Sequence, residues 1–145
     1  MNKVKIDTNI KYVKSPYTLK IDGGEYDVIN DIEEAVECIQ KGRVPIARFE
    51  WGNSMDPILK NGEYGLIIPI ESLDDIEVGD AVLCKVGDYY MTHMVMMISS
   101  SNCNGKMFLI GNTWMQFYGW TNEIFGIVKG TNILEMPNEE VEEVN

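Results

Sequence analysis

The sequence predicts a mainly β domain, an antiparallel sheet preceded by one helix. Short segments rich in β-branched and aromatic residues recur along the chain, and Gly, Asn and Asp separate them as turn residues do. One segment near the N-terminus instead places its apolar residues at helical spacing. The 145 residues, 45% of them hydrophobic, suit one globular domain with a short extension.

The N-terminal residues 1–43 are predicted to form a hairpin and a helix as an accessory piece. Residues 4–6 and 17–21 alternate in the manner of strands, and Asp22-Gly23-Gly24 marks a turn before residues 26–28.

The helix is expected over residues 31–41. Asn30 or Asp31 caps it, Glu33 or Glu34 occupies the capping-box position, and Gly42 ends it. Its apolar residues share one face, which predicts packing against the core rather than a partner groove. They are Ile32, Ala35, Val36 and Ile39.

The β domain is expected over residues 44–135, followed by an acidic, disordered tail over 136–145. Gly87-Asp88 is a strong hairpin signal between two of its strands. The aromatic run 114–120 is interpreted as a loop packed over the core, with a carbohydrate-binding or peptide-binding platform as the alternative. Strands are expected at 44–49, 64–70, 80–86, 89–98, 106–110 and 123–128.

The charge balance excludes some partners. Twelve Lys and Arg against 23 Asp and Glu give a net charge of −11, which argues against nucleic acid and anionic lipid. The three cysteines lack the spacing of a disulfide framework or zinc site, so reduced thiols are expected. Without an apolar N-terminal run or spanning segment, we expect a cytoplasmic protein, with no metal and no cofactor.

Ser54 is the first candidate for chemistry. Gly52 and Asn53 permit a sharp turn after a strand, and Pro57 suits the first turn of a short helix. A serine at that junction lies beside exposed backbone N–H groups that can bind an anion. Ser54 is also a favoured helix N-cap, and the composition of this segment alone favours that simpler role.

His93, the only histidine, is the second candidate. It alternates with Met91 and Val95 in an apolar strand. A histidine is suited to accept a proton near neutral pH, since its reference pKa is about 6.5. A partly buried structural histidine is the alternative interpretation.

Taken together, these segments resemble the signal-peptidase and LexA-type clan of serine peptidases. The segment 52–59 is similar to the clan's G-x-S-M-x-P-x-L box, and 78–83 to its "GDIV" box. Residues 91–95 resemble the strand that carries a histidine base in the soluble Ser-His branch. Residues 109–112 and 124–128 resemble the two boxes that follow.

The resemblance covers residues 44–130 and implies a coiled antiparallel sheet with a Ser54–His93 dyad. It implies a soluble serine endopeptidase that hydrolyses peptide bonds, with an extended peptide bound as an added strand. Ser54 is the expected nucleophile and its backbone N–H the oxyanion donor. Further orienting or oxyanion candidates are Gly52, Asn53, Met55 and Asn112.

Three positions depart from the family pattern. Asn112 stands where an aspartate usually orients the histidine, Met94 replaces an arginine, and Glu63 replaces an aspartate. A catalytically decayed peptidase fold that acts as a structural or partner-binding protein, including a phage-encoded one, is therefore the alternative function.

Overall fold

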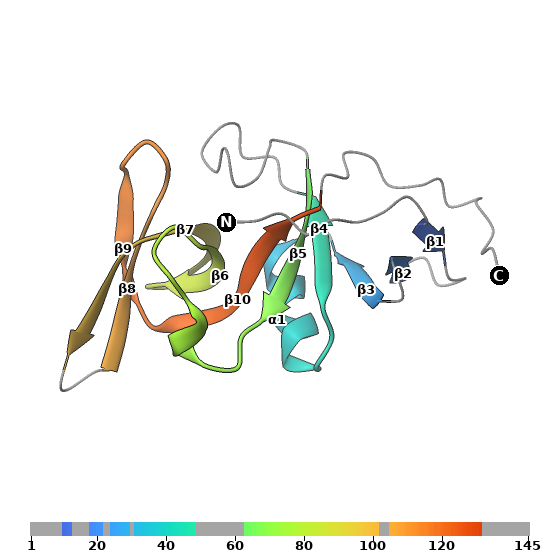
Figure 1. Cartoon of the computed structure of the whole chain (residues 1–145), viewed down its shortest axis with the longest axis horizontal. Helices are drawn as coiled ribbons and strands as arrows, with labels where there is room; N and C mark the ends of the chain where they lie inside the picture. The colour runs from blue at the N-terminus through green and yellow to red at the C-terminus, as the bar shows by residue number, and fades with distance from the viewer. Residues whose placement is uncertain are drawn as a thin grey trace.

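In a computed structural model of the chain, the described residues form a ten-stranded sheet with one α-helix packed against it (Figure 1). The strands follow the spatial order β1-β2-β3-β4-β5-β10-β6-β7-β8-β9. The mainly β class expected from the sequence is confirmed. The residues described are 10–12, 18–21, 24–29, 31–48, 63–101 and 105–131.

The elements alternate with short connections along most of the described chain. They are β1 (Ile10–Tyr12), β2 (Thr18–Ile21), β3 (Gly24–Ile29), α1 (Ile32–Gln40), β4 (Pro45–Arg48), β5 (Tyr64–Pro69), the 3₁₀ turn η1 (Leu73–Asp75), β6 (Ala81–Val86), β7 (Tyr89–Ser101), β8 (Gly105–Gly111), β9 (Phe117–Thr121) and β10 (Glu123–Gly130).

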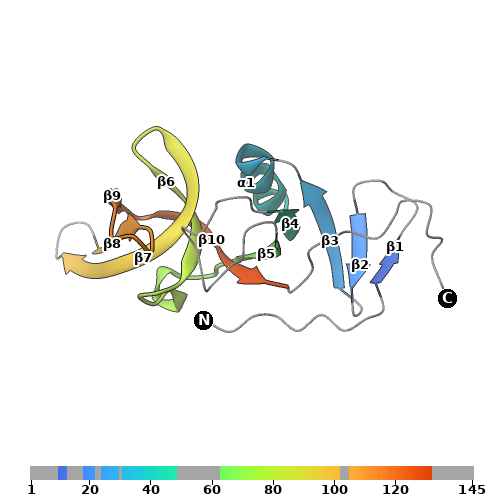
Figure 2. The ribbon, with the colours of Figure 1, turned by 90° about the horizontal axis from the view of Figure 1, so that it is seen from above.

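The sheet is mixed rather than wholly antiparallel, which corrects the prediction. β3 and β4 run parallel, with Val28 opposite Ile46, while the other described pairs are antiparallel. The reason is the connection: α1 carries the chain back to the starting end of β3, so β4 begins in the same direction. This pairing also joins the N-terminal hairpin to the sheet (Figure 2).

The helix forms where its sequence signals predict. The Asp31 carboxylate accepts a hydrogen bond from the Glu34 backbone N–H at 2.8 Å, which satisfies one of the free donors of the first turn. Gly42 follows the last turn with φ of 78°, a conformation that glycine adopts without strain. Ala35 and Val36 are buried against the sheet, as expected.

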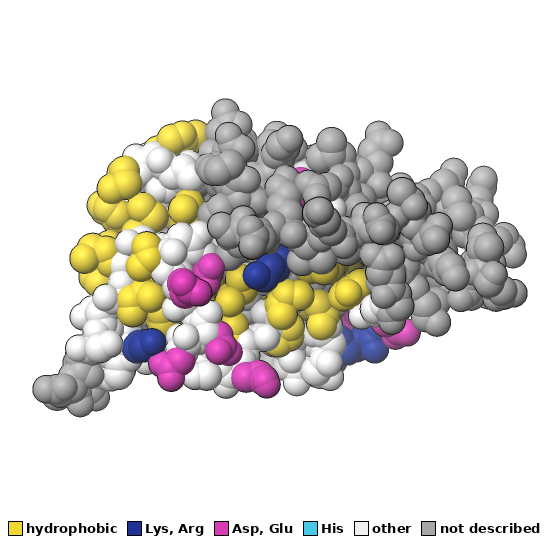
Figure 3. All heavy atoms as spheres, viewed as in Figure 1, with side chains coloured by type: hydrophobic (Ala, Val, Ile, Leu, Met, Phe, Trp, Pro, Cys, Tyr) yellow, Lys and Arg dark blue, Asp and Glu magenta, His cyan; other side chains and the backbone are white. Residues whose placement is uncertain are grey.

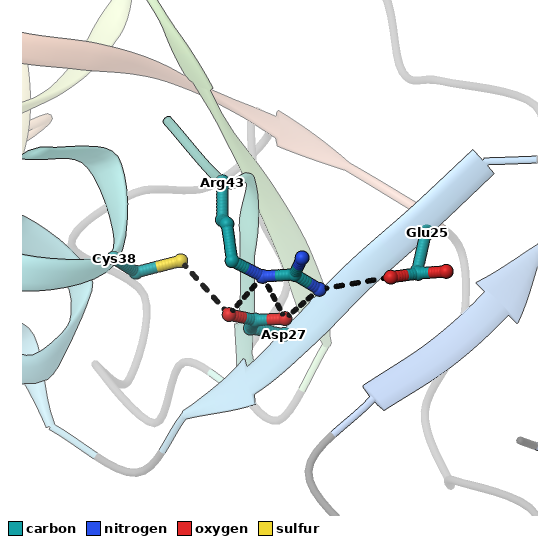
Figure 4. Close-up of polar contacts among 4 residues, drawn as sticks. All are labelled: Glu25, Asp27, Cys38 and Arg43. Atoms are coloured by element: carbon teal, nitrogen blue, oxygen red, sulfur yellow. Dashed lines mark hydrogen bonds and ion pairs between the residues drawn. The ribbon is translucent and has the colours of Figure 1, made fainter. Parts of the chain in front are cut away.

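Ion pairs and a thiol hydrogen bond connect β3 to α1 and to the segment between α1 and β4 (Figure 4). The Arg43 Nε lies 2.7 Å and 2.8 Å from the two carboxylate oxygens of Asp27, and its Nη2 lies 3.0 Å from Glu25. The Cys38 thiol donates to Asp27 at 3.6 Å. Arg43 holds the pKa of Asp27 below its usual value through these hydrogen bonds.

Two apolar cores lie within the fold. The first, the helix core, packs α1 against the sheet. The second, the curl core, lies within β6, β7, β8 and β10, and the Thr121 hydroxyl donates to the Lys85 carbonyl at 2.5 Å where β9 approaches β6. The helix core consists of Ile29, Ala35, Val36, Ile67, Ala81, Leu83 and Val128. The curl core consists of Ile76, Val82, Cys84, Val95, Phe108, Ile110 and Ile124.

The aromatic run 114–120 differs from the prediction. Its second half is strand β9, at the end of the sheet order, rather than a loop. Several of its side chains face solvent instead of covering the core, and Trp114 is 59% exposed. β1 was likewise not expected. The strand expected at residues 4–6 lies outside the described residues.

Candidate active site

The predicted site residues divide into two groups. His93 and Asn112 belong to the described sheet, whereas Ser54 and its neighbours lie outside the described residues. Those neighbours are Gly52, Asn53 and Met55. The geometry of the site is therefore built from the histidine.

His93 lies in the middle of the sheet, on β7, where it pairs with Val82 of β6. Met91 and Val95 lie two residues to either side, and both belong to the curl core or pack against it. Because side chains alternate along a strand, His93 points toward that same apolar side. It is 9% exposed.

This environment determines the charge of the imidazole. Burial lowers the pKa of His93 to about 4, because an apolar surrounding disfavours the charged form. His93 is therefore neutral at pH 7. A neutral imidazole has a free lone pair and is the form that accepts a proton in general base catalysis.

The described residue that covers the imidazole is Tyr118, from β9. The two rings stack with their centroids 4.5 Å apart and their planes at 25°. Sequence reasoning placed Tyr118 in a loop and gave it no link to His93. The available signal was its position six residues after Asn112, which stands where the family pattern has the residue that orients the histidine.

Asn112 uses its side chain to hold the segment that carries Tyr118. Its Nδ2 donates to the Gln116 side chain at 2.7 Å and to the Tyr118 hydroxyl at 3.0 Å. Its Oδ1 accepts from the backbone N–H groups of Trp114 and Gln116 at 2.9 Å and 3.1 Å. Four bonds match the capacity of an amide side chain. In these contacts Asn112 bonds to Tyr118, and Tyr118 in turn stacks on His93.

Gly111 lets this segment close. A Cβ there would lie 2.6 Å from the Gln116 carbonyl oxygen and 2.8 Å from the Met96 Cγ. The first of these atoms is backbone and cannot move away cheaply. Glycine at this position therefore allows the chain after β8 to fold back and form the Asn112 hydrogen bonds.

The other two departures from the family pattern also lie among the described residues. Met94 pairs with Ala81 and packs against the helix core, so it occupies an apolar site. Glu63 is wholly buried just before β5. The strand pairing gives Met94 a packing role that an arginine would not fill in the same way.

The described residues show neither a metal-binding group nor a membrane-spanning helix. Within them, no group of three or more His, Cys, Asp or Glu side chains is arranged to hold a metal ion. The helix that the structure describes lacks the length and apolar character needed to cross a bilayer.

No protein-family model, curated protein or solved structure matches the chain in sequence or structure comparisons. The case for a function therefore depends on the residues themselves.

Proposed function

We propose that the chain is a serine peptidase of the LexA and signal-peptidase type, in which Ser54 and His93 form a catalytic dyad. Ser54 Oγ attacks the carbonyl carbon of a peptide bond while His93 takes its proton. His93 then gives that proton to the leaving amine as the C–N bond breaks, which leaves an acyl-enzyme. Water, deprotonated by His93, attacks the ester, and His93 returns the proton to Ser54 Oγ as the C–O bond breaks and the acid leaves.

The observation that carries this proposal is the neutral, apolar setting of His93. Within the described residues, the surroundings of His93 include the curl core and the ring of Tyr118, and burial is the cause of its lowered pKa. That setting stabilises the proton-accepting form, which a general base requires.

The length of the chain is compatible with contact between the two residues. Ser54 is six residues after Arg48, the end of β4 (54 − 48), and an extended span of that length reaches about 20 Å. In the sheet order, β7 is four strands from β4. At about 4.8 Å per strand, that separation is roughly 19 Å across a flat sheet.

A serine-directed fluorophosphonate probe tests the dyad. We expect covalent labelling of the folded wild-type chain and a loss of at least about 100-fold in Ser54→Ala and His93→Gln, because each change removes one half of the dyad. Ser100→Ala is the matched control, since Ser100 is exposed on the same strand as His93 and its loss should leave labelling unchanged. Absence of labelling in the folded wild type contradicts the proposal.

A second candidate is a non-catalytic, partner-binding role, which the exposed hydrophobic side chains around β9 favour (Figure 3). A surface of several large apolar residues is typical of an interaction site. These residues are Met97, Trp114, Met115, Phe117, Tyr118 and Trp120. A folded chain that no serine probe labels, and whose Ser54→Ala variant behaves like wild type, would favour this alternative.

A further inference from the structure

We propose that Tyr118 is a positioning residue for His93, and that Asn112 holds Tyr118 in place by a hydrogen bond to its hydroxyl. The stacked ring would orient the imidazole, as an aspartate does in other peptidases with a histidine base. It rests on the proposed role of His93 as the base, although its main test requires no activity.

The stacking geometry supports this role. A centroid distance of 4.5 Å and an angle of 25° place one face of the phenol over the imidazole. Tyr118 is 40% exposed, so the ring has contact with solvent while it covers the buried histidine. Such a ring limits rotation of the imidazole out of its plane and keeps water from that face.

The Tyr118 ring is itself restrained at its tip. Asn112 is 1% exposed and donates from Nδ2 to the phenol oxygen at 3.0 Å. The turn around Asn112 is closed by two backbone bonds, from Asn112 N–H to the Gln116 carbonyl at 3.0 Å and from Met115 N–H to the Asn112 carbonyl at 3.1 Å. A buried amide with all its hydrogen bonds formed has one preferred orientation, so it fixes the hydroxyl that it contacts.

The chemical consequence concerns the charge of the base. An aspartate beside a histidine would stabilise the imidazolium and raise its pKa. An aromatic ring excludes water without adding a negative charge, so it favours the neutral base. This expected lowering of the pKa agrees with the pKa of His93, which burial lowers.

His93 is the only histidine in the chain, so its ring protons give one resolvable titration by NMR. We expect the wild-type imidazole to titrate near pH 4. Tyr118→Ala should raise this pKa by roughly one to two units toward the reference value, because water reaches the exposed face. Tyr118→Phe should raise it less, since the ring stays but loses its hydrogen bond to Asn112.

Trp120→Ala is the matched control, because it removes another exposed aromatic side chain from β9 and should leave the titration unchanged. If Tyr118→Ala does not fold, Tyr118→Leu replaces the ring with a non-aromatic side chain of intermediate size and should show the same rise. A folded Ala or Leu variant with the wild-type pKa overturns the proposal.

Activity gives a second readout that distinguishes this proposal from the dyad. In the wild type, His93 should stay neutral between pH 8 and pH 5, so protonation of the base should not slow labelling. In Tyr118→Ala the labelling rate should fall about tenfold at pH 5, since a base with a pKa near 6 is mostly protonated there. If the wild type is not labelled, the dyad fails while the titration still decides the role of Tyr118. If labelling occurs and the Ala variant keeps the wild-type pH profile, the positioning role fails while the dyad stands.

Discussion

Two titratable groups lie in different parts of the sheet, the partly exposed Asp27 on β3 and the buried His93 on β7, and their surroundings favour opposite charge states. Asp27, beside α1, is surrounded by hydrogen-bonding partners and is held charged by Arg43. His93, on β7, has an apolar core on one side and an aromatic ring on the other, and is held neutral.

The different surroundings of Asp27 and His93 indicate a structural role for the first and a chemical role for the second. A carboxylate with satisfied partners ties elements together, and in this fold the Asp27 ion pair connects β3 to the chain that follows α1. A titratable group whose pKa is shifted by burial in an apolar setting is held in one charge state, here the uncharged form that can accept a proton. Strongly shifted pKa values of this kind are common at functional sites.

The largest expected effect tests the His93 side of this comparison. His93 titrates at about 4 when folded and near 6.5 when unfolded, so the unfolded state binds more protons between these values. Stability from this group is therefore present above pH 6.5 and is lost as the pH falls toward 4, by up to about 3 kcal/mol.

Chemical denaturation at pH 7 and at pH 4.5, on the wild type and on His93→Gln, measures this loss. The variant should lose less stability on acidification, because glutamine does not titrate. Equal losses in both chains would show that His93 is not held neutral by the fold.

A smaller effect is expected at Asp27. Asp27→Asn removes the charge from the pair with Arg43 and should cost about 1 kcal/mol at pH 7, because the pair is partly exposed and solvent screens it. The folded pKa of Asp27 is lowered, so this stability is present above the unfolded value and disappears as the pH falls through the folded one.

Urea unfolding at pH 7 and pH 2 checks the Asp27 effect, with Glu25→Gln as a control that removes only the outer ion pair of Arg43. If Asp27→Asn and Glu25→Gln lose the same small amount of stability, the Asp27–Arg43 pair contributes no more than the Glu25–Arg43 pair.

The smallest effect concerns one buried thiol in each region. Burial raises the pKa of Cys38 to about 11 and that of Cys84 to about 12. Because the thiolate is the reactive form, iodoacetamide at pH 8 should modify both slowly in the folded chain and rapidly in urea. Peptide mapping by mass spectrometry locates the modified residues, and fast native labelling of either one would contradict its burial.

The fold was predictable where local patterns decide it. The spacing of Ala35 and Val36, with the Asp31 cap, indicated α1, and Gly87-Asp88 indicated the turn between β6 and β7. β9 was missed because Gly119 interrupts it and its three aromatic side chains are all at least 40% exposed, so no alternation of buried and exposed residues marks the strand.

The site was predictable to a lesser degree. His93 was identified as a candidate because it is the only histidine and because residues 91–95 resemble the strand that carries the base in the peptidase family. Tyr118 was not, since the two residues are 25 positions apart (118 − 93) and meet only because β8 and β9 fold back beside β7. The parallel pairing of β3 and β4 was missed for a similar reason, because a sequence pattern predicts strands but not which strands pair.

That parallel pairing has a consequence for shortened forms of the protein. Ile46 is fully buried, and β4 has β3 on one side and β5 on the other. A chain trimmed to begin at residue 44 would leave a row of backbone amides and carbonyls on β4 open to solvent. An exposed edge strand of this kind can pair with strands of other molecules, so the trimmed protein should self-associate.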